Sequence, residues 1–199
     1  MKHLLLSLLV AGLSACSSKP LDVNYYVLSP PQPVLQSNQN NYTKQVKLNK
    51  ILLADYLRQS SIALQVDDNK MHFSRQDVWA ESLDMAILNA LLMDLNQNTN
   101  TSFSSYLSPD NQADSTTLTL QIEHFHATDK STVVSSGRYW LFDPVKQQKF
   151  ESPFYFSLSL QQDGYSHAIS QQRQLIRLLA DKIQLDLAKF DKMETKNRS

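Results

Sequence analysis

Leu118-Thr119-Leu120-Gln121-Ile122-Glu123 alternates apolar and polar side chains at every step. A period of two is typical of a β-strand that buries one face and leaves the other in water. Phe154-Tyr155-Phe156-Ser157-Leu158 repeats the alternation, and residues 132–142 between them predict a further strand that ends at the turn residues Asp143-Pro144. We therefore expect three successive strands of one sheet, and Pro153 indicates that the third begins at a sheet edge or a bulge.

Shorter runs upstream predict the rest of the sheet. Residues 25–28 (Tyr-Tyr-Val-Leu) have the composition of a buried strand. Residues 62–66 alternate as well, and the turn residues Asp67-Asp68-Asn69-Lys70 join them to residues 71–73 as a hairpin. The remaining predicted strands are residues 46–53 and a short segment near Phe103.

Two long helices complete the predicted fold. The first is expected over residues 75–95, with Ser74 as its N-cap and Asp77 at the third helical position, near the positive end of the helix dipole. Its apolar side chains recur at a spacing of 3.6 residues: Trp79, Leu83, Ile87, Ala90, Leu91 and Leu95. The second helix is expected over residues 166–190, after the Asp163-Gly164 turn. Its apolar stripe consists of Ile169, Ile176, Leu179, Ile183 and Leu187.

These elements predict an α/β fold of the α+β sandwich type. It consists of one mixed, largely antiparallel β-sheet with two long amphipathic helices packed on one face. A chain of 199 residues suits a single domain with a sizeable core. We assign this domain to residues 24–190 and expect residues 191–199 to fray.

The first residues of the chain carry an export pattern. Lys2 and His3 give a basic start, and the apolar run of residues 4–12 spans only about half of a ~30 Å hydrocarbon core. Such a run is too short to cross a bilayer stably. The pattern is typical of a secretory signal peptide, which we assign to residues 1–15.

Leu13-Ser14-Ala15-Cys16 resembles the bacterial lipobox. The resemblance implies that the Cys16 thiol forms a thioether to diacylglycerol and that the amine freed by cleavage is acylated. Two or three acyl chains make a durable anchor, because a single chain anchors only marginally. Residues 16–23 would then be a lipidated tether, and Ser17 in place of aspartate implies sorting to the outer membrane. The alternative is an ordinary exported protein with a chance cysteine near its cleavage site.

Charge and cysteine content narrow the function. The chain has 19 basic and 19 acidic residues, so it lacks the basic excess that nucleic-acid binding demands. Cys16 is the only cysteine, so no disulfide can form within the chain and the fold must depend on its core. With three glycines there is no phosphate-binding loop, and the Gly-x-Ser-x-Gly motif of hydrolases is missing.

Two pairs of side chains raise the question of catalysis or metal binding. His124 and His126 lie two apart on a predicted strand and point the same way, but no third ligand follows at a suitable spacing. Glu81 and Asp84 share a face of the first predicted helix, and such a face is more often solvated than catalytic. We therefore predict no catalytic residue, no metal site, no cofactor other than the covalent lipid on Cys16, and no enzyme activity.

Several features occur together in a fixed order along the chain. They are Asp55-Tyr56-Leu57-Arg58, the strand at Ile62, the hairpin after it, Trp79-Ala80-Glu81-Ser82-Leu83 and the closing helix from Tyr165. With the lipobox, they resemble the PqiC/YmbA family of lipoproteins over residues 24–189. The resemblance implies an auxiliary component of an intermembrane lipid transport system of the mammalian-cell-entry (MCE) type.

The resemblance implies an outer-membrane lipoprotein on the periplasmic face, which docks a membrane-spanning MCE-domain protein and contributes to envelope integrity. Outer-membrane lipid and a second copy of the chain are further candidate partners. The alternative is a stand-alone periplasmic carrier that binds one lipid between the helices and the sheet, whereas a hydrolase would need a nucleophile and base that the sequence does not present. Docking requires an exposed apolar patch. Its candidates are Trp79, which is either a core anchor or part of an interface, the wet-face Tyr155 and the Gln/Asn-rich loops.

Overall fold

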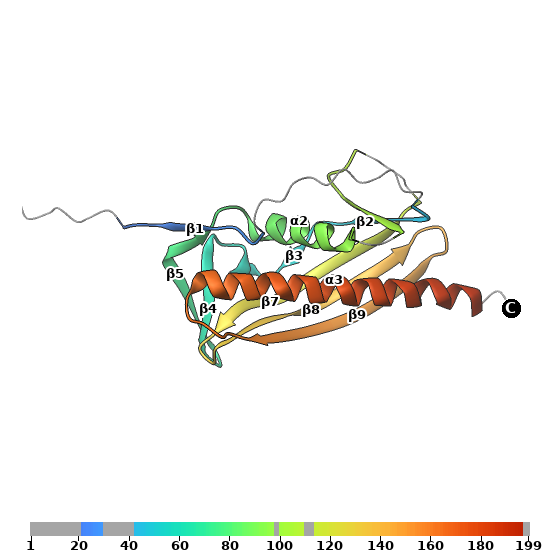
Figure 1. The fold of residues 1–199 in the computed structure, drawn as a ribbon. Helices are drawn as coiled ribbons and strands as arrows, with labels where there is room; N and C mark the ends of the chain where they lie inside the picture. Colours follow the sequence, from blue (N-terminus) through green and yellow to red (C-terminus); the bar gives the residue numbers. More distant parts are fainter. Residues whose placement is uncertain (1–20, 30–41, 98–99, 110–113, 197–199) are drawn as a thin grey trace, which may run out of the picture.

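The structure is a computed structural model that describes residues 21–29, 42–97, 100–109 and 114–196. Within these residues, one mixed, nine-stranded β-sheet carries helices α2 (Leu83–Leu95) and α3 (Tyr165–Lys196) on a single face (Figure 1). The predicted fold class is therefore confirmed. The Gln/Asn-rich segment named above as a possible docking loop lies mostly outside the described residues.

Strand β7 (Thr116–Thr128) is the centre of the sheet and contains the alternating stretch 118–123. It pairs antiparallel with β8 (Thr132–Asp143), which pairs antiparallel with β9 (Gln148–Ser159) at the sheet edge. All three predicted strands are confirmed. Pro153 lies inside β9 and has no backbone N–H to donate, which is tolerated because an edge strand is paired on one side only.

The other edge of β7 is shared by three short strands, which pair with it in parallel one after another. They are β2 (Lys44–Leu48), β3 (Leu52–Leu53) and β4 (Ser61–Asp67). The predicted strand over residues 46–53 is thus divided between β2 and β3. Strand β6 (Thr101–Ser105), expected near Phe103, pairs in parallel with β2 and extends the sheet beyond it. The long strands are therefore antiparallel, and most of the short pairings are parallel.

Strand β4 and strand β5 (Lys70–Trp79) form the predicted hairpin, and β1 (Asn24–Tyr26) pairs in parallel with the outer edge of β5. The prediction of a buried strand over residues 25–28 is wrong at its start, because Tyr25 is 71% exposed. Strand β1 is an edge strand, and no described element covers its outward side. Leu28, which is 2% exposed, lies in the core, and the partly buried Tyr26 packs against it.

The predicted start of the first helix is also wrong. Residues 75–79 continue strand β5, and helix α2 begins only at Leu83. The Ser74 hydroxyl does accept the N–H of Asp77 at 2.9 Å, as an N-cap would. However, the Asp77 carboxylate also accepts a hydrogen bond from Asn24 of β1, and β5 has strand partners on both edges here. Strand pairing therefore overrides the local cap chemistry.

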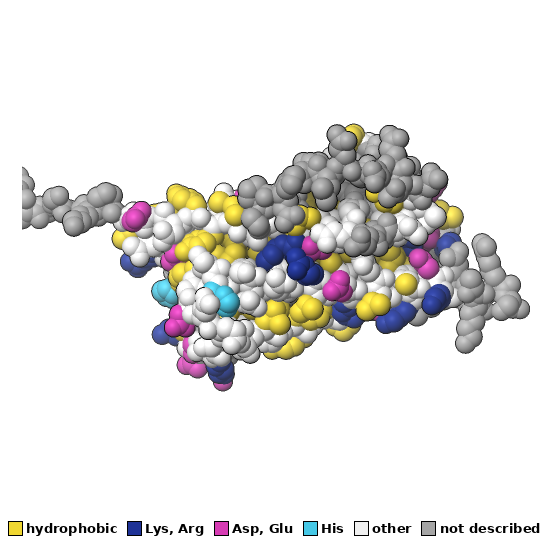
Figure 2. All heavy atoms as spheres, in the orientation of Figure 1, with side chains coloured by type: hydrophobic (Ala, Val, Ile, Leu, Met, Phe, Trp, Pro, Cys, Tyr) yellow, Lys and Arg dark blue, Asp and Glu magenta, His cyan; other side chains and the backbone are white. Residues whose placement is uncertain are grey.

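The hydrophobic core fills the space between the helices and the sheet. Both layers supply fully buried side chains: Ile87 and Leu91 from α2, Ile176, Leu179 and Ile183 from α3, and Leu118, Leu120, Ile122 and Leu141 from the sheet. The outward side of α3 carries charged, polar and scattered hydrophobic side chains (Figure 2). Helix α3 passes its predicted end at Phe190 and continues to Lys196, and fraying from residue 191 stays a prediction.

Candidate anchor and docking surfaces

The predicted anchor lies at the start of the chain. Cys16 and the signal peptide over residues 1–15 fall outside the described residues, so acylation of Cys16 stays a prediction. The described chain begins at Leu21, five residues after Cys16. No helix in the described part of the chain is long and apolar enough to cross a membrane. The described segment nearest the predicted anchor is therefore β1 with the residues just before it.

Trp79 is a core residue. Its side chain is 6% exposed and belongs to the main hydrophobic core. It ends strand β5, where it pairs with Tyr26 of β1. Because the side chain is buried, Trp79 reaches no partner unless the domain opens. Of the two roles open to it from the sequence, the core role is confirmed.

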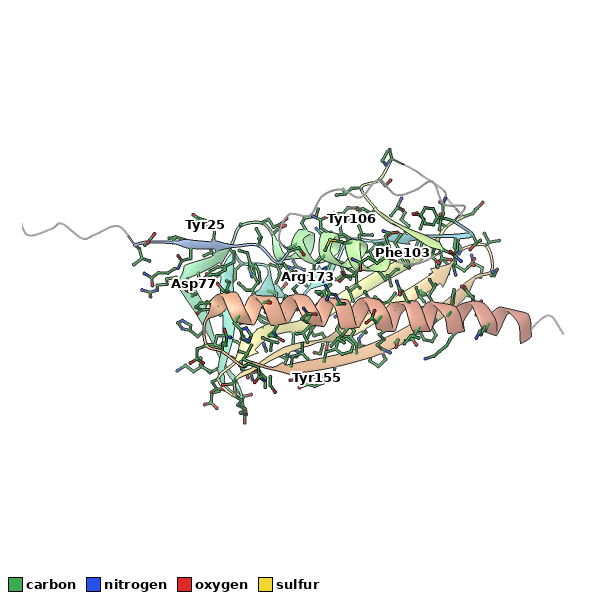
Figure 3. All side chains as sticks on the ribbon, in the orientation of Figure 1. Tyr25, Asp77, Phe103, Tyr106, Tyr155 and Arg173 are labelled. Atoms are coloured by element: carbon green, nitrogen blue, oxygen red, sulfur yellow. The ribbon has the colours of Figure 1, made fainter. Side chains whose placement is uncertain are left out.

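Tyr155 lies on the side of the sheet that faces away from the helices, and it is 71% exposed. Side chains alternate along β9, so Phe154 is buried in the core and Tyr155 points outward. The register places Tyr155 beside Ser136 of β8, which in turn pairs with His124 of β7. Figure 3 shows Tyr155 on β9, far from the β1 strand in that view. The predicted exposure of Tyr155 is confirmed.

We call the outward side of β7, β8 and β9 the open sheet face, because neither helix packs on it. Its outward side chains include Thr119, Gln121, Arg138, Trp140, Phe142, Glu151 and Tyr155. Arg138 is held between two carboxylates, with Nη2 at 3.6 Å from Glu123 Oε1 and Nη1 at 3.3 Å from Glu151 Oε1. The face thus combines aromatic rings with an arginine that is already positioned.

Sequence reasoning identified Tyr155 but missed Trp140, Phe142 and Arg138. The signal that identifies them is the alternation over residues 132–142. Tyr139 and Leu141 are fully buried on the helix side, so the residues that alternate with them, Arg138, Trp140 and Phe142, point outward. Trp140 and Phe142 are therefore partly exposed on the same face as Tyr155.

His124 and His126 point to the same side, as predicted, with ring centroids 5.6 Å apart. His124 Nδ1 lies 2.8 Å from the Ser136 hydroxyl. His126 is buried near the Tyr56 ring, and its Nδ1 has no hydrogen-bond partner. Burial, with a smaller contribution from His124, lowers the pKa of His126 to about 4. The described residues contain no group of three or more His, Cys, Asp or Glu side chains placed to hold a metal ion.

Glu81 and Asp84 do not share a helix face, contrary to the prediction, because α2 begins at Leu83. Glu81 is exposed and precedes the helix. Asp84 lies in the first turn, where a carboxylate interacts favourably with the helix dipole. Its position is therefore explained by helix stability.

Two surface cavities are formed by described side chains. The larger, of about 630 Å³, lies beside β2 and has a polar lining that includes the ion pair between Lys44 and Asp191. The smaller, of about 270 Å³, lies between β3 and the start of α2 and is lined in part by Arg58 and Asp84. The first lacks the apolar lining of a lipid site. The second is below the ~300–1,000 Å³ typical of ligand pockets.

The family described as the ABC-type transport auxiliary lipoprotein component matches residues 26–184, and the chain belongs to this family. The resemblance predicted from the sequence is thereby confirmed.

The individual proteins that this chain resembles have low sequence identity to it. The intermembrane transport lipoproteins PqiC of Escherichia coli (strain K12) and Shigella flexneri are each 26% identical to this chain over 171 residues, which is 85% of this chain and 88% of the relative. The crystal structure of an uncharacterized protein has a TM-score of 0.71 at 22% identity and covers 83% of this chain and 99% of its own. A Xanthomonas campestris protein reaches 0.68 at 9% identity, over 87% and 99%. The structural likeness shows the fold alone, whereas the family makes the chain a lipoprotein component of a transport system.

Proposed function

We propose that this chain is the docking subunit of an MCE-type intermembrane lipid transport system, anchored through Cys16 to the periplasmic face of the outer membrane. The observation that carries the proposal is the family match over residues 26–184. It is supported by the 26% identity to lipoproteins named for intermembrane transport. In this role the acyl anchor supplies the location, and the folded body supplies the surface that holds a transport partner and so supports envelope integrity.

The open sheet face is the surface that we assign to the partner, a membrane-spanning MCE-domain protein. It carries Tyr155, Trp140 and Arg138, and these three residue types are enriched among the side chains that dominate interface energies. Arg138 is already held by Glu123 and Glu151, so docking costs it little conformational freedom. A second copy of the chain is the other candidate for this surface.

A stand-alone lipid carrier has less support. A carrier would bind lipid between the helices and the sheet, but this layer is filled by fully buried side chains such as Ile87, Leu120 and Ile176. An acyl chain would have to separate these side chains from one another. Such a separation loses well-packed apolar contact over the area that it opens.

The test is capture of the partner from the envelope. The full-length lipoprotein with a C-terminal tag is extracted in a mild detergent, and co-purifying proteins and lipids are identified by mass spectrometry. The Cys16→Ala variant, which has no thiol to acylate, is the control. An MCE-domain protein in large excess over the control supports the proposal. Stoichiometric phospholipid without such a protein would favour the carrier, and recovery of this chain alone would indicate self-association.

A matched pair of variants tests the surface. Tyr155 on β9 is 71% exposed on the open sheet face, and Leu185 on α3 is 66% exposed away from that face. We expect Tyr155→Ser to weaken partner capture about tenfold, which corresponds to about 1.4 kcal/mol of binding free energy. Leu185→Ser should leave capture unchanged. Equal capture by both variants would remove the open sheet face from the proposal.

A further inference from the structure

A second outward surface lies at the β1 edge of the sheet, close to the predicted anchor. From Leu21 onward, every second side chain is apolar, and all but the half-buried Val23 are exposed. We call these four residues the β1 stripe: Leu21, Val23, Tyr25 and Val27. Leu21 is 59% exposed and Val27 is 48% exposed, beside Tyr25 at 71%. Figure 3 shows Tyr25 on β1, on the opposite side of the view from Tyr155.

The body holds the β1 stripe in position from behind. Two of the side chains between its members bind the body, because Asn24 and Tyr26 both donate hydrogen bonds to Asp77 of β5, at 3.0 and 3.1 Å. The β1 backbone pairs with β5. Just beyond the stripe, the Ser29 hydroxyl accepts a hydrogen bond from Arg173 of α3 at 3.0 Å. The stripe therefore cannot turn inward without breaking these contacts.

The β1 stripe is also the described surface nearest to Cys16 along the chain. Cys16 and Leu21 are five residue steps apart. An extended chain covers at most about 3.5 Å per step, so the two Cα atoms lie within about 18 Å of each other. Tyr25 follows about 13 Å further, at ~3.3 Å per residue along the strand. An acyl anchor on Cys16 would thus keep the stripe near the bilayer surface, whatever path the linking residues take.

We infer that the β1 stripe lies on the phospholipid bilayer surface and sets the orientation of the body there. The inference rests on the proposed acylation of Cys16. A tyrosine ring is apolar and its hydroxyl is polar, which suits the boundary between acyl chains and headgroups. Leu21 and Val27 add apolar area on the same side. A weak contact is sufficient, because the anchor makes the contact intramolecular.

The chemistry of the stripe distinguishes this contact from electrostatic attraction. The exposed Asp22 lies within the stripe, and no basic side chain stands between Leu21 and Val27. Anionic headgroups attract clusters of Lys and Arg, so anionic lipid should not strengthen the binding of this surface to the bilayer. The orientation has a consequence for docking. Strands β1 and β9 lie at opposite edges of the sheet, so a bilayer in contact with β1 lies at the other edge of the sheet from Tyr155.

The experiment measures which side chain touches lipid. Cys16 is the only cysteine, and acylation consumes its thiol, so an introduced cysteine is the only free thiol of the mature lipoprotein. Tyr25→Cys and, as the matched control, Tyr155→Cys are labelled with a solvent-sensitive fluorophore. The full lipidated chains are reconstituted into phosphatidylcholine vesicles whose acyl chains are partly brominated, because bromine quenches fluorescence. We expect the label at position 25 to lose most of its fluorescence and the label at position 155 to lose none.

Flotation of the vesicles is measured first, because it tests acylation of Cys16 separately from contact of the β1 stripe with lipid. A chain that does not float contradicts acylation of Cys16 and the inference with it. A chain that floats without quenching at position 25 overturns the inference and leaves the anchor standing. Quenching at position 155 in place of 25 also overturns it. A spectral shift of the label at position 25 that does not depend on bromine and that grows with protein density would also overturn the inference, because it indicates contact with a second copy.

Two further measurements support the same conclusion. Replacing part of the phosphatidylcholine by phosphatidylglycerol should leave the quenching unchanged, and a strong increase would contradict an apolar contact. Leu21→Ser combined with Val27→Ser changes two exposed side chains only, so the circular dichroism spectrum should be unaltered. The same pair of changes should reduce the quenching at position 25. Undiminished quenching in that variant would overturn the role of the stripe.

Discussion

Arg173 in helix α3 and Asp94 in helix α2 form a bidentate ion pair inside the domain. The Nη1 and Nη2 atoms of the arginine donate to the two carboxylate oxygens at 2.5 and 2.6 Å, and both side chains are buried. Removing two charges from water is costly, but the paired geometry satisfies both groups. The pair therefore stabilises the contact between the two helices only while both partners are present.

Removing one partner of this pair should cost more than removing both. We expect Arg173→Met to lower the free energy of unfolding by about 3–5 kcal/mol, because Asp94 is left as a buried charge without a counter-ion. The double variant Asp94→Leu with Arg173→Met should recover most of that loss. Urea unfolding measures the effect, with Arg177→Met on the exposed side of the same helix as the control. A loss of unfolding free energy in the double variant that equals the sum of the losses in the two single variants would contradict the prediction.

Mild acid should destabilise the domain through His126. Burial and the neighbouring His124 lower its pKa from an ordinary 6.5 to about 4. Between these values the unfolded chain binds a proton at this position and the folded chain does not, so the stability is fully present above pH 6.5 and is lost as the pH falls. A shift of this size corresponds to stability on the order of 3 kcal/mol.

His126→Phe tests this pH dependence, because phenylalanine keeps a ring in the buried site and cannot be protonated. We expect the free energy of unfolding of this variant to vary less than that of the wild type across the same pH window. His72→Phe, an exposed position in β5, should retain the wild-type dependence. Parallel curves for wild type and His126→Phe would show that another group causes the acid sensitivity.

The backbones of β7 and β8 approach each other closely at Gly137. A register shift between Ile122 and His124 marks a β-bulge at this point. A Cβ on residue 137 would lie 2.0 Å from the carbonyl oxygen of Gln121, which is backbone and cannot swing aside. We expect Gly137→Ala to lower the free energy of unfolding by about 1–3 kcal/mol or more. Thermal and urea unfolding measure the loss against Ser157→Ala, and equal stability of the two variants would contradict it.

The sequence predicts the strands well where one face is wet and the other dry. Residues 118–123 and 154–158 show this alternation, and both lie in the expected strands with the expected faces. The same reasoning fails at residues 75–82, because Trp79 continues the helical spacing of α2 while it belongs to a strand. The hydrogen bond at Ser74 does not distinguish the strand from a helix start, because the Ser74 hydroxyl accepts a backbone N–H as an N-cap would. Only the distant pairing with β1 and β4 decides the outcome.

The sequence likewise predicts some features of the candidate docking surface and not others. The exposure of Tyr155 follows from alternation alone, whereas the burial of Trp79 depends on which elements cover it. The position of Arg138 between Glu123 and Glu151 joins three strands. It depends on the bulge in β7, which sets the register with β8 and which no local pattern reveals.

Asp186 of α3 connects this helix to the sheet. It accepts hydrogen bonds from Tyr139 at 2.6 Å and Ser152 at 3.0 Å, and it contacts the ammonium groups of Lys182 and Lys189 at 3.0 and 2.8 Å. Burial alone would raise its pKa, but these hydrogen bonds outweigh burial and hold the pKa below the ordinary 3.8. The carboxylate therefore stabilises the fold above pH 3.8, and this contribution is lost as the pH falls below it.

Asp186→Asn removes the charge and keeps the size of the side chain. We expect it to lower the free energy of unfolding at neutral pH by about 1.5–3 kcal/mol, the range for a hydrogen bond to a charged group. The difference from the wild type should shrink as the pH falls below 3.8, because the wild-type carboxylate is then protonated in the unfolded chain. Losses from His126 are common to both proteins and cancel in this difference. A difference that stays constant with pH would mean that Asp186 acts through its shape and not through its charge.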